Sequence, residues 1–324
     1  RAAMLYRLAL RLRPEAPAEE GRRVRAALAE ALANAGRGLE AAEAYGEAAA
    51  VASGSDALEL RRLSAEHLLR SGHFEQGMAA LRLVLAEVDM RIPATPRAAL
   101  LSLLARRTRV RFRGTQWTER SGSEVAALAR FRVDLCWSVA VGLAMIDPIR
   151  GSDFQARSLV LALDLGEPTR VARTLAMEGA YSAVASGEGG VRRAFHLLDR
   201  SLELAGRLAD PMAEALARSS RGVVLYEQGR WGEARAELES AEVLLVERCT
   251  GVFWELATTR HFLCLTLEMM GDLAELARRV PEYVRDAEAR GDRFTATSFR
   301  SGNLNLVALH HDDPAVLAKR KVIV

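Results

Sequence analysis

One short element recurs along this chain and limits its fold more than any other feature. It has a glycine at the first position, a large apolar residue at the third, and glutamate or glutamine at the fifth. It occurs at 36–40, where the apolar residue is shifted by one position, and again at 72–76, 229–233 and 271–275. Glycine accepts the left-handed backbone that ends a helix and lets the next helix start at once. The element therefore predicts repeated tight turns between antiparallel helices.

A second kind of boundary recurs between these turns, at 166–168, 209–211, 250–251 and 291–292. The spacing of roughly 41 to 43 residues is typical of a repeated helix pair. An acidic residue before proline suits the start of a helix, because the carboxylate caps it and proline fits its first position. The same reasoning applies to three other pairs, Thr95-Pro96, Asp147-Pro148 and Asp313-Pro314.

The residues around the turns resemble tetratricopeptide repeats. In those repeats small residues stand where the two helices of one repeat touch, and larger residues stand where neighbouring repeats touch. Near Gly36 the small residues are Ala29, Ala41 and Ala48, with bulky Leu28, Leu32 and Tyr45; near Gly229 they are Gly222, Ala234 and Ala241, with Leu225 and Leu238. The repeats near Gly72 and Gly271 fit less well. Alanine, leucine, arginine and glutamate dominate the composition, and all favour helices. We predict an all-α fold, an α-α superhelix in the form of a tetratricopeptide-like solenoid of antiparallel helix pairs.

The repeat is hard to see in the middle of the chain. We expect tetratricopeptide-like pairs over 1–92, with the first repeat truncated, arginine-rich bridging helices over 93–165, and further pairs over 166–324. Diverged repeats in one unbroken solenoid are an equal alternative for the middle. The chain begins at Arg1 within a predicted helix and ends without a polar cap, although solenoids normally carry one. We therefore expect it to be part of a longer protein.

Missing motifs argue against catalysis. A P-loop and a protein kinase each need a lysine on the nucleotide phosphates, and the only lysines are Lys319 and Lys321. Zinc-site spacings of cysteine and histidine are absent, as is the Gly-x-Ser-x-Gly elbow of hydrolases. His261 and Cys264 share a helix face, but apolar neighbours favour packing over metal binding. The adjacent His310 and His311 face different directions on a helix. We expect no catalytic, cofactor-binding or metal-binding residue, and no enzyme in this segment.

Five arginines crowd one short segment: Arg106, Arg107, Arg109, Arg111 and Arg113. They could form a docking patch for an acidic protein surface or for nucleic acid phosphates. The simpler interpretation, which we favour, is that they are arginines near a helix C-terminus, where the helix dipole stabilises positive charge. A tetratricopeptide groove would also present first-helix residues, here Arg25, Glu30, Arg61 and Arg62.

Several strings together resemble one family. They are 68–73 (LLRSGH), 91–96 (RIPATP), 134–138 (DLCWS), 150–155 (RGSDFQ) and 247–251 (ERCTG). They resemble the C-terminal repeat region of large bacterial signalling proteins, in which a serine/threonine kinase domain and an AAA-type ATPase module precede tetratricopeptide helices. The resemblance implies that the kinase and ATPase lie upstream of this segment. It also implies that the repeat region senses partners or regulates the attached domains.

These observations predict a non-catalytic protein–protein interaction or regulatory scaffold. Its partner would be a protein or peptide, including upstream domains of the same chain. The alternative is a transcription regulator or nucleic-acid-associated protein that contacts phosphates through Arg106 to Arg113. A net charge of +3 is weak evidence for nucleic acid, which we do not expect as a partner. Three widely spaced cysteines suit the cytoplasm, and no apolar run reaches the roughly 18 residues of a membrane span.

Overall fold

The computed structural model describes residues 1–300 except 14, 16, 122–124, 145 and 184–186, together with residue 307. Within these residues the regular structure consists of fifteen α-helices, so the predicted all-α class is confirmed. The helices are α1 (Ala2–Leu12), α2 (Ala18–Ala33), α3 (Gly38–Ala50), α4 (Gly54–Arg70), α5 (Phe74–Glu87), α6 (Pro96–Arg113), α7 (Ala127–Leu143), α8 (Pro148–Leu165), α9 (Pro168–Ala183), α10 (Glu188–Leu208), α11 (Pro211–Glu227), α12 (Trp231–Arg248), α13 (Phe253–Met269), α14 (Leu273–Arg290) and α15 (Arg293–Arg300).

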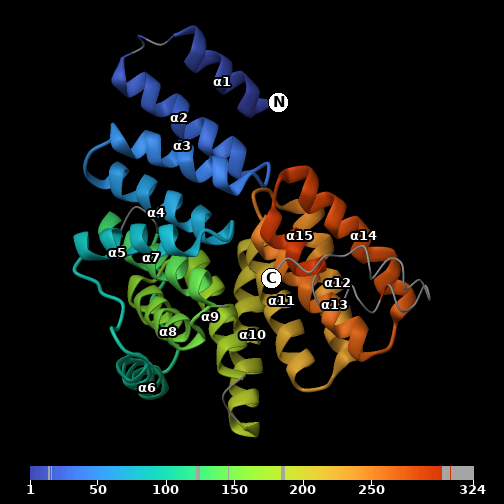
Figure 1. Cartoon of the computed structure of the whole chain (residues 1–324). Coiled ribbons are helices and arrows are strands. Elements are labelled where there is room, and N and C mark those ends of the chain that lie inside the picture. Colours follow the sequence, from blue (N-terminus) through green and yellow to red (C-terminus); the bar gives the residue numbers. More distant parts are fainter. Residues whose placement is uncertain are drawn as a thin grey trace.

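Most helices pack against the helices that precede and follow them in sequence. This holds from α1 to α5 and again from α7 to α15. In addition, α9 packs on α11 and α11 on α13, so the first helices of successive pairs form one layer. Figure 1 shows the pairs following one another along a curved path. The predicted α-α superhelix of antiparallel helix pairs is therefore confirmed.

The turns within the pairs have the predicted backbone. Gly36, Gly72, Gly229 and Gly271 all have positive φ angles, between 71° and 84°. Three boundaries between pairs end the preceding helix in the same left-handed region, at Gly166, Gly291 and even Ala209, which has a φ of 50°. At the fourth, α12 ends on Cys249 in an extended conformation. The side chains of Thr95, Asp147 and Asp210 accept hydrogen bonds from backbone N–H groups in the first turns of α6, α8 and α11. The proposed cap at Asp313 lies outside the described residues.

Small residues bring the two helices of a pair close together. Ala29, Ala41 and Ala48 are fully buried between α2 and α3. At Gly222 a β-carbon would lie 2.5 Å from Leu238 of α12. At Gly77, where the repeat pattern asks for alanine, a β-carbon would lie 2.7 Å from the Leu69 side chain. The irregular repeat near Gly72 is thus a closer version of the same contact.

The middle segment leaves the simple order of pairs. Helix α6 packs on α8, whereas α7 pairs with α8 and also packs on α4 and α5. The pair α7–α8 therefore follows α4–α5 in space, and α6 lies outside this stack, at the lower left of Figure 1. The boundaries at 92 and 165 stay a prediction.

The two ends of the superhelix meet. The Arg70 guanidinium at the end of α4 lies 3.3 Å from the Glu255 carboxylate at the start of α13. Phe74 of α5 meets Phe294 of α15 edge to face, with ring centroids 5.9 Å apart. A β-carbon at Gly36 would lie 2.4 Å from the Arg290 side chain. In Figure 1 the blue and red ends of the chain accordingly lie next to each other.

Candidate functional site

The arginine-rich segment forms the C-terminal half of α6, which is anchored by its inner face. Ala99, Leu103 and Val110 are buried there. Arg106 lies 3.1 Å from Asp153, a fully buried carboxylate of α8. Arg107 lies 3.3 Å from Glu178 of α9 and donates a hydrogen bond to the backbone oxygen of Tyr181. Burial raises the pKa of Glu178. These two arginines therefore compensate buried carboxylates of the fold.

The other arginines of the cluster lie nearer to solvent. Arg113 forms an ion pair with Asp164 at 2.8 Å, and Arg109 approaches the same carboxylate at 3.7 Å with 64% of its side chain exposed. Arg111 is exposed. The cluster is therefore divided, and only Arg109 and Arg111 present much of their charge to a partner.

The outer face of α6 exposes apolar side chains beside these arginines. Leu101 is 69% exposed, Leu104 is 53% exposed and Phe112 is 86% exposed, and Leu100 lies beside them. Arg97 is exposed in the first turn of the same helix. The helix contains no acidic residue. We call Arg97, Leu100, Leu101, Leu104, Arg109, Arg111 and Phe112 the α6 outer face.

Of the four predicted groove residues, Arg25, Glu30 and Arg61 are exposed or half-buried, and Arg62 is buried. Arg25 of α2 lies 3.6 Å from Glu47, and Glu30 is exposed. Arg61 of α4 pairs with Glu87 of α5 at 2.7 Å. Arg62, by contrast, is buried between α4 and α7 and serves an internal network.

That network joins α4, α7 and α13. The Arg62 guanidinium contacts the carboxylates of Glu59 and Glu66 at 2.6 Å and donates to Ser138 Oγ at 2.7 Å. Glu66 also pairs with Arg70 at 2.9 Å. Burial alone would raise the pKa of Glu66, but the charges of Arg70 and Arg62 lower it to about 2. Ionised Glu66 thus holds two arginines in place where the ends of the superhelix meet.

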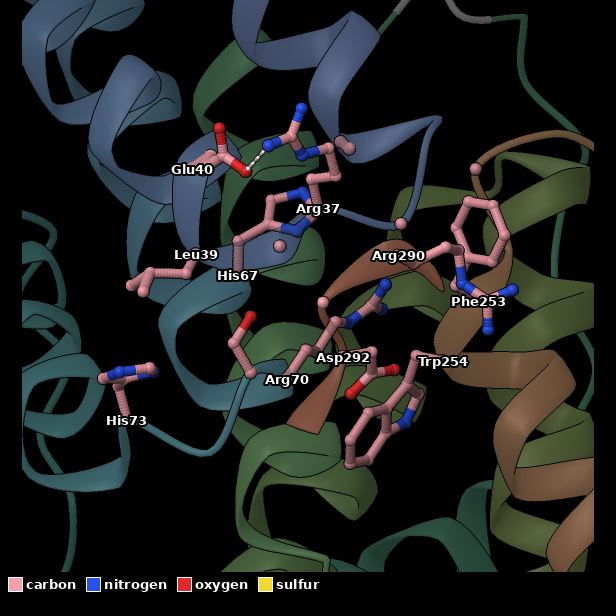
Figure 2. A pocket seen from close by; sticks show the side chains of 16 residues that line it. Arg37, Leu39, Glu40, His67, Arg70, His73, Phe253, Trp254, Arg290 and Asp292 are labelled. Atoms are coloured by element: carbon pink, nitrogen blue, oxygen red, sulfur yellow. Dashed lines mark ion pairs between the residues drawn. The ribbon is translucent and has the colours of Figure 1, made fainter. Parts of the chain in front are cut away.

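A pocket of about 440 Å³ opens at this junction (Figure 2). Figure 2 shows Arg37 and Glu40, an ion pair at the start of α3, above His67 and Arg70 of α4. Phe253 and Trp254 of α13 line the pocket opposite them, and the Arg290 guanidinium lies 4.6 Å from the Phe253 ring centre. Arg37, Arg70 and Arg290 each have a carboxylate or an aromatic ring beside them. We therefore interpret the junction as a contact that closes the superhelix.

A second cavity of about 310 Å³ lies on the inner side of the superhelix. It is lined mainly by α7, α9, α11, α13 and α15, and we call it the central cavity. Its phenylalanine, tyrosine and tryptophan lining residues are Trp137, Tyr181, Trp254, Phe262, Phe294 and Phe299. Trp254 lines both this cavity and the junction pocket, and its ring stacks on Phe294 with centroids 6.0 Å apart. Trp254 therefore forms a wall that the two cavities share, and Phe294 supports its ring from the central cavity.

His261 and Cys264, the pair considered for metal binding, do not belong to a larger group of metal ligands within the described residues. Burial raises the pKa of Cys264 to about 12 and lowers that of His261, so the thiol stays protonated and the imidazole neutral at pH 7. Among the described residues, no group of three or more histidine, cysteine or acidic side chains could hold a metal ion. In the same part of the chain no helix is long and apolar enough to cross a membrane. His310 and His311 lie outside the described residues.

Comparisons with known proteins do not identify a family for this chain. No protein-family model matches this chain, and no curated protein matches it either. What is established is the fold, in which the described helices pack as sequential antiparallel pairs, as in a helical repeat.

Sequence reasoning found the arginine segment but missed the junction and the central cavity. Both depend on contacts between residues far apart in sequence, such as Phe74 with Phe294. The sequence offers no local signal for either, because Trp137 stands in the interior of α7 and Trp254 at the start of α13, so the two rings share no position of a repeat.

Proposed function

We propose that this chain is a non-catalytic protein-interaction module whose α6 outer face binds an acidic, amphipathic segment of a partner protein. The observation that carries the proposal is the exposed set of Leu101, Leu104 and Phe112 on a helix whose opposite face is firmly anchored. Exposed apolar patches on folded proteins commonly mark interaction sites, and aromatic residues and arginine are enriched in protein interfaces.

Charge selects the kind of partner. Arg97 and Arg111 are exposed at opposite ends of the apolar stripe, and Arg109 is largely exposed. With no acidic residue in α6, the face is uniformly basic. An apolar segment flanked by aspartate or glutamate would complement it in both polarity and charge.

A nucleic acid is a weaker fit to the same face. Arg106, Arg107 and Arg113, three members of the arginine cluster, are paired with Asp153, Glu178 and Asp164 and have little charge left for phosphates. Leucine side chains also contribute nothing to backbone phosphate contacts, which dominate nucleic acid affinity. The nucleic-acid alternative thus rests on Arg109 and Arg111.

The resemblance to kinase- and ATPase-bearing signalling proteins supplies the context of the proposal. In such a protein the acidic segment would belong to an upstream domain or to a separate regulator, and the module would transmit binding to the attached domains. The helical superhelix, which presents α6 on a rigid support, suits this role.

The test is affinity capture with the whole chain, followed by direct titration of the identified partner. We expect Phe112→Ser to weaken binding by about 2 kcal/mol, or roughly thirtyfold, as for an aromatic anchor of an interface. Arg111→Glu should weaken it further at low salt. Leu83→Ser and Arg82→Glu on α5 are matched controls, because both residues are exposed but lie outside the α6 outer face.

Three outcomes would contradict the proposal. The first is a partner whose affinity is the same for Phe112→Ser and for the Leu83→Ser control. The second is binding to DNA or RNA with a steep salt dependence that Arg109→Gln and Arg111→Gln abolish. The third is binding to vesicles of anionic lipid that depends on Phe112, since a basic helix with an apolar face can also bind membrane surfaces.

A further inference from the structure

The central cavity has the size and lining of a small-molecule site. Its volume of about 310 Å³ falls at the lower end of the roughly 300–1,000 Å³ found for such pockets. Aromatic rings from four helices surround it, and most of its wall surface is apolar, although several serines and threonines, Glu255 and His261 also line it. Such a lining favours a flat apolar molecule, because ring stacking and burial of apolar surface supply the affinity.

The polar residues on the wall select the charge of that molecule. Glu255 lines the cavity; its Oε1 lies 3.3 Å from Arg70, and its Oε2 has no hydrogen-bond partner within the described part of the chain. Together with Glu59, Arg62, Glu66 and Arg70, it forms a network with one more negative than positive charge. A buried carboxylate with a free acceptor favours a cation or a hydrogen-bond donor and repels an anion.

We propose that the central cavity binds a small planar aromatic molecule that carries a single positive charge. The ring system lies among Trp137, Trp254 and Phe294, and the charged group lies toward Glu255. Neutral His261 on the same wall adds no positive charge, and the two nearby guanidiniums are each paired, Arg70 with Glu66 and Glu255 and Arg173 with Asp134. This site is separate from the α6 outer face, so it goes beyond the proposed protein interaction.

Binding of a ligand in the cavity would also stabilise the contact between the two ends of the superhelix. Trp254, which a ligand contacts, also lines the junction pocket, and its ring stacks on Phe294. Phe294 in turn meets Phe74 of the N-terminal part. A ligand that fits this closed arrangement binds it more tightly than an open one and so raises the population of the closed form.

The test uses the whole chain and two matched probes, the cation 1-naphthylmethylammonium and the anion 1-naphthoate. Titration calorimetry gives their affinities, and quenching of tryptophan fluorescence reports contact with Trp137 and Trp254. We expect the cation to bind at least about tenfold more tightly than the anion, which is the cost of about 1.4 kcal/mol for an unfavourable charge. Equal affinities, or tighter binding of the anion, would overturn the proposal.

Two variants locate the site. Ala180→Phe places a ring in the cavity and should abolish binding of the cation, whereas Ala86→Phe on the exposed side of α5 should not change it. Val223→Phe fills the same cavity from α11 and replaces Ala180→Phe if that variant does not fold. Unchanged affinity in the folded filling variant would show that the probe binds elsewhere and would refute the site.

A third variant isolates the charge. Glu255→Gln keeps the shape of the side chain, so the cation should lose its tenfold advantage while both probes still bind. Glu282→Gln, an exposed carboxylate on α14, is the matched control. A retained preference for the cation in folded Glu255→Gln would contradict the role of this carboxylate. Phe112→Ser should leave probe binding unchanged, which separates a failure of this site from a failure of the α6 outer face.

Discussion

Glu66→Gln is the substitution that most directly tests the buried network. Glu66 contacts Arg62 at 2.6 Å, Arg70 at 2.9 Å and the hydroxyl of Ser138. Glutamine has nearly the same shape, so packing between α4 and α7 should be preserved. The change removes one negative charge and leaves two buried arginines with fewer partners.

Two routes give the size of the effect. The pKa of Glu66 falls from 4.5 to about 2 on folding, and at about 1.4 kcal/mol per pKa unit this corresponds to roughly 3 kcal/mol. Breaking a buried ion pair by removing one partner typically costs about 3–5 kcal/mol. The lower end applies here, because Arg62 keeps Glu59 and Arg70 keeps Glu255. We expect a loss of about 3 kcal/mol at pH 7.

The same reasoning fixes the pH dependence. A carboxylate whose pKa is lower in the folded state stabilises the fold above its unfolded pKa, and this contribution is lost as pH falls toward the folded pKa. The difference in unfolding free energy between wild type and Glu66→Gln should therefore be constant above pH 4.5 and shrink toward zero near pH 2. Urea unfolding followed by circular dichroism measures this difference. Hydrogen exchange of the backbone amides in α4 and α7 measures the local loss of stability around the network.

Glu43→Gln serves as the control, because Glu43 is exposed on α3. Its effect should stay within about 0.5 kcal/mol, as for ordinary surface substitutions. The reasoning would be refuted if Glu66→Gln were no more destabilising than Glu43→Gln. A difference that did not shrink between pH 4.5 and pH 2 would also refute it, because the lost stability would then not come from the charge of Glu66.

Three further predictions concern single side chains. At neutral pH a thiol reagent should modify half-buried Cys249 but not Cys136 or Cys264, because burial raises the pKa of each of the latter to about 12; mass spectrometry counts the labels. Leu69→Ala, which empties the space between two glycines of α5 and α7, should cost about 3 kcal/mol in urea unfolding. In an NMR titration His67 should gain its proton only near pH 4, because burial lowers its pKa, and this residue should reduce stability as pH falls from 6.5 to 4.

The turns and the fold class could be predicted because their causes are local. A left-handed helix end needs glycine, and the residues that follow it start the next helix at once. Gly36 and Gly229 meet this need from within a few residues of sequence. The repeated spacing then implies a stack, since each pair buries its apolar face only against a neighbour.

The placement of α6 could not be predicted, because its apolar residues surround the helix. Leu103 is buried, while its neighbours Leu101 and Leu104 are 69% and 53% exposed. A helix with leucine on both faces does not reveal which face packs. The segment was recognised as irregular, but its packing on α8 and the internal pairing of Arg106 and Arg107 depend on the fold.

The junction was equally hidden from the sequence. Arg70 and Glu255 are 185 residues apart, and each looks like an ordinary charged residue of a helix surface. Helix pairs with the same local pattern build open and closed superhelices alike, because small rotations per repeat accumulate into the overall curvature. Arg62 was expected to face a groove for the same reason, since the pattern alone does not show that α7 covers it.

Contact between the two ends also sets how this architecture can vary in length. An open solenoid gains or loses a helix pair with little effect on distant pairs, because each repeat touches only its neighbours. Here Phe74 must still reach Phe294 around the whole curve. Duplication of one pair would push these rings apart and break the contact between Arg70 and Glu255. The number of pairs between α4 and α15 is therefore fixed by the geometry of closure, as the number of strands is fixed in a closed barrel.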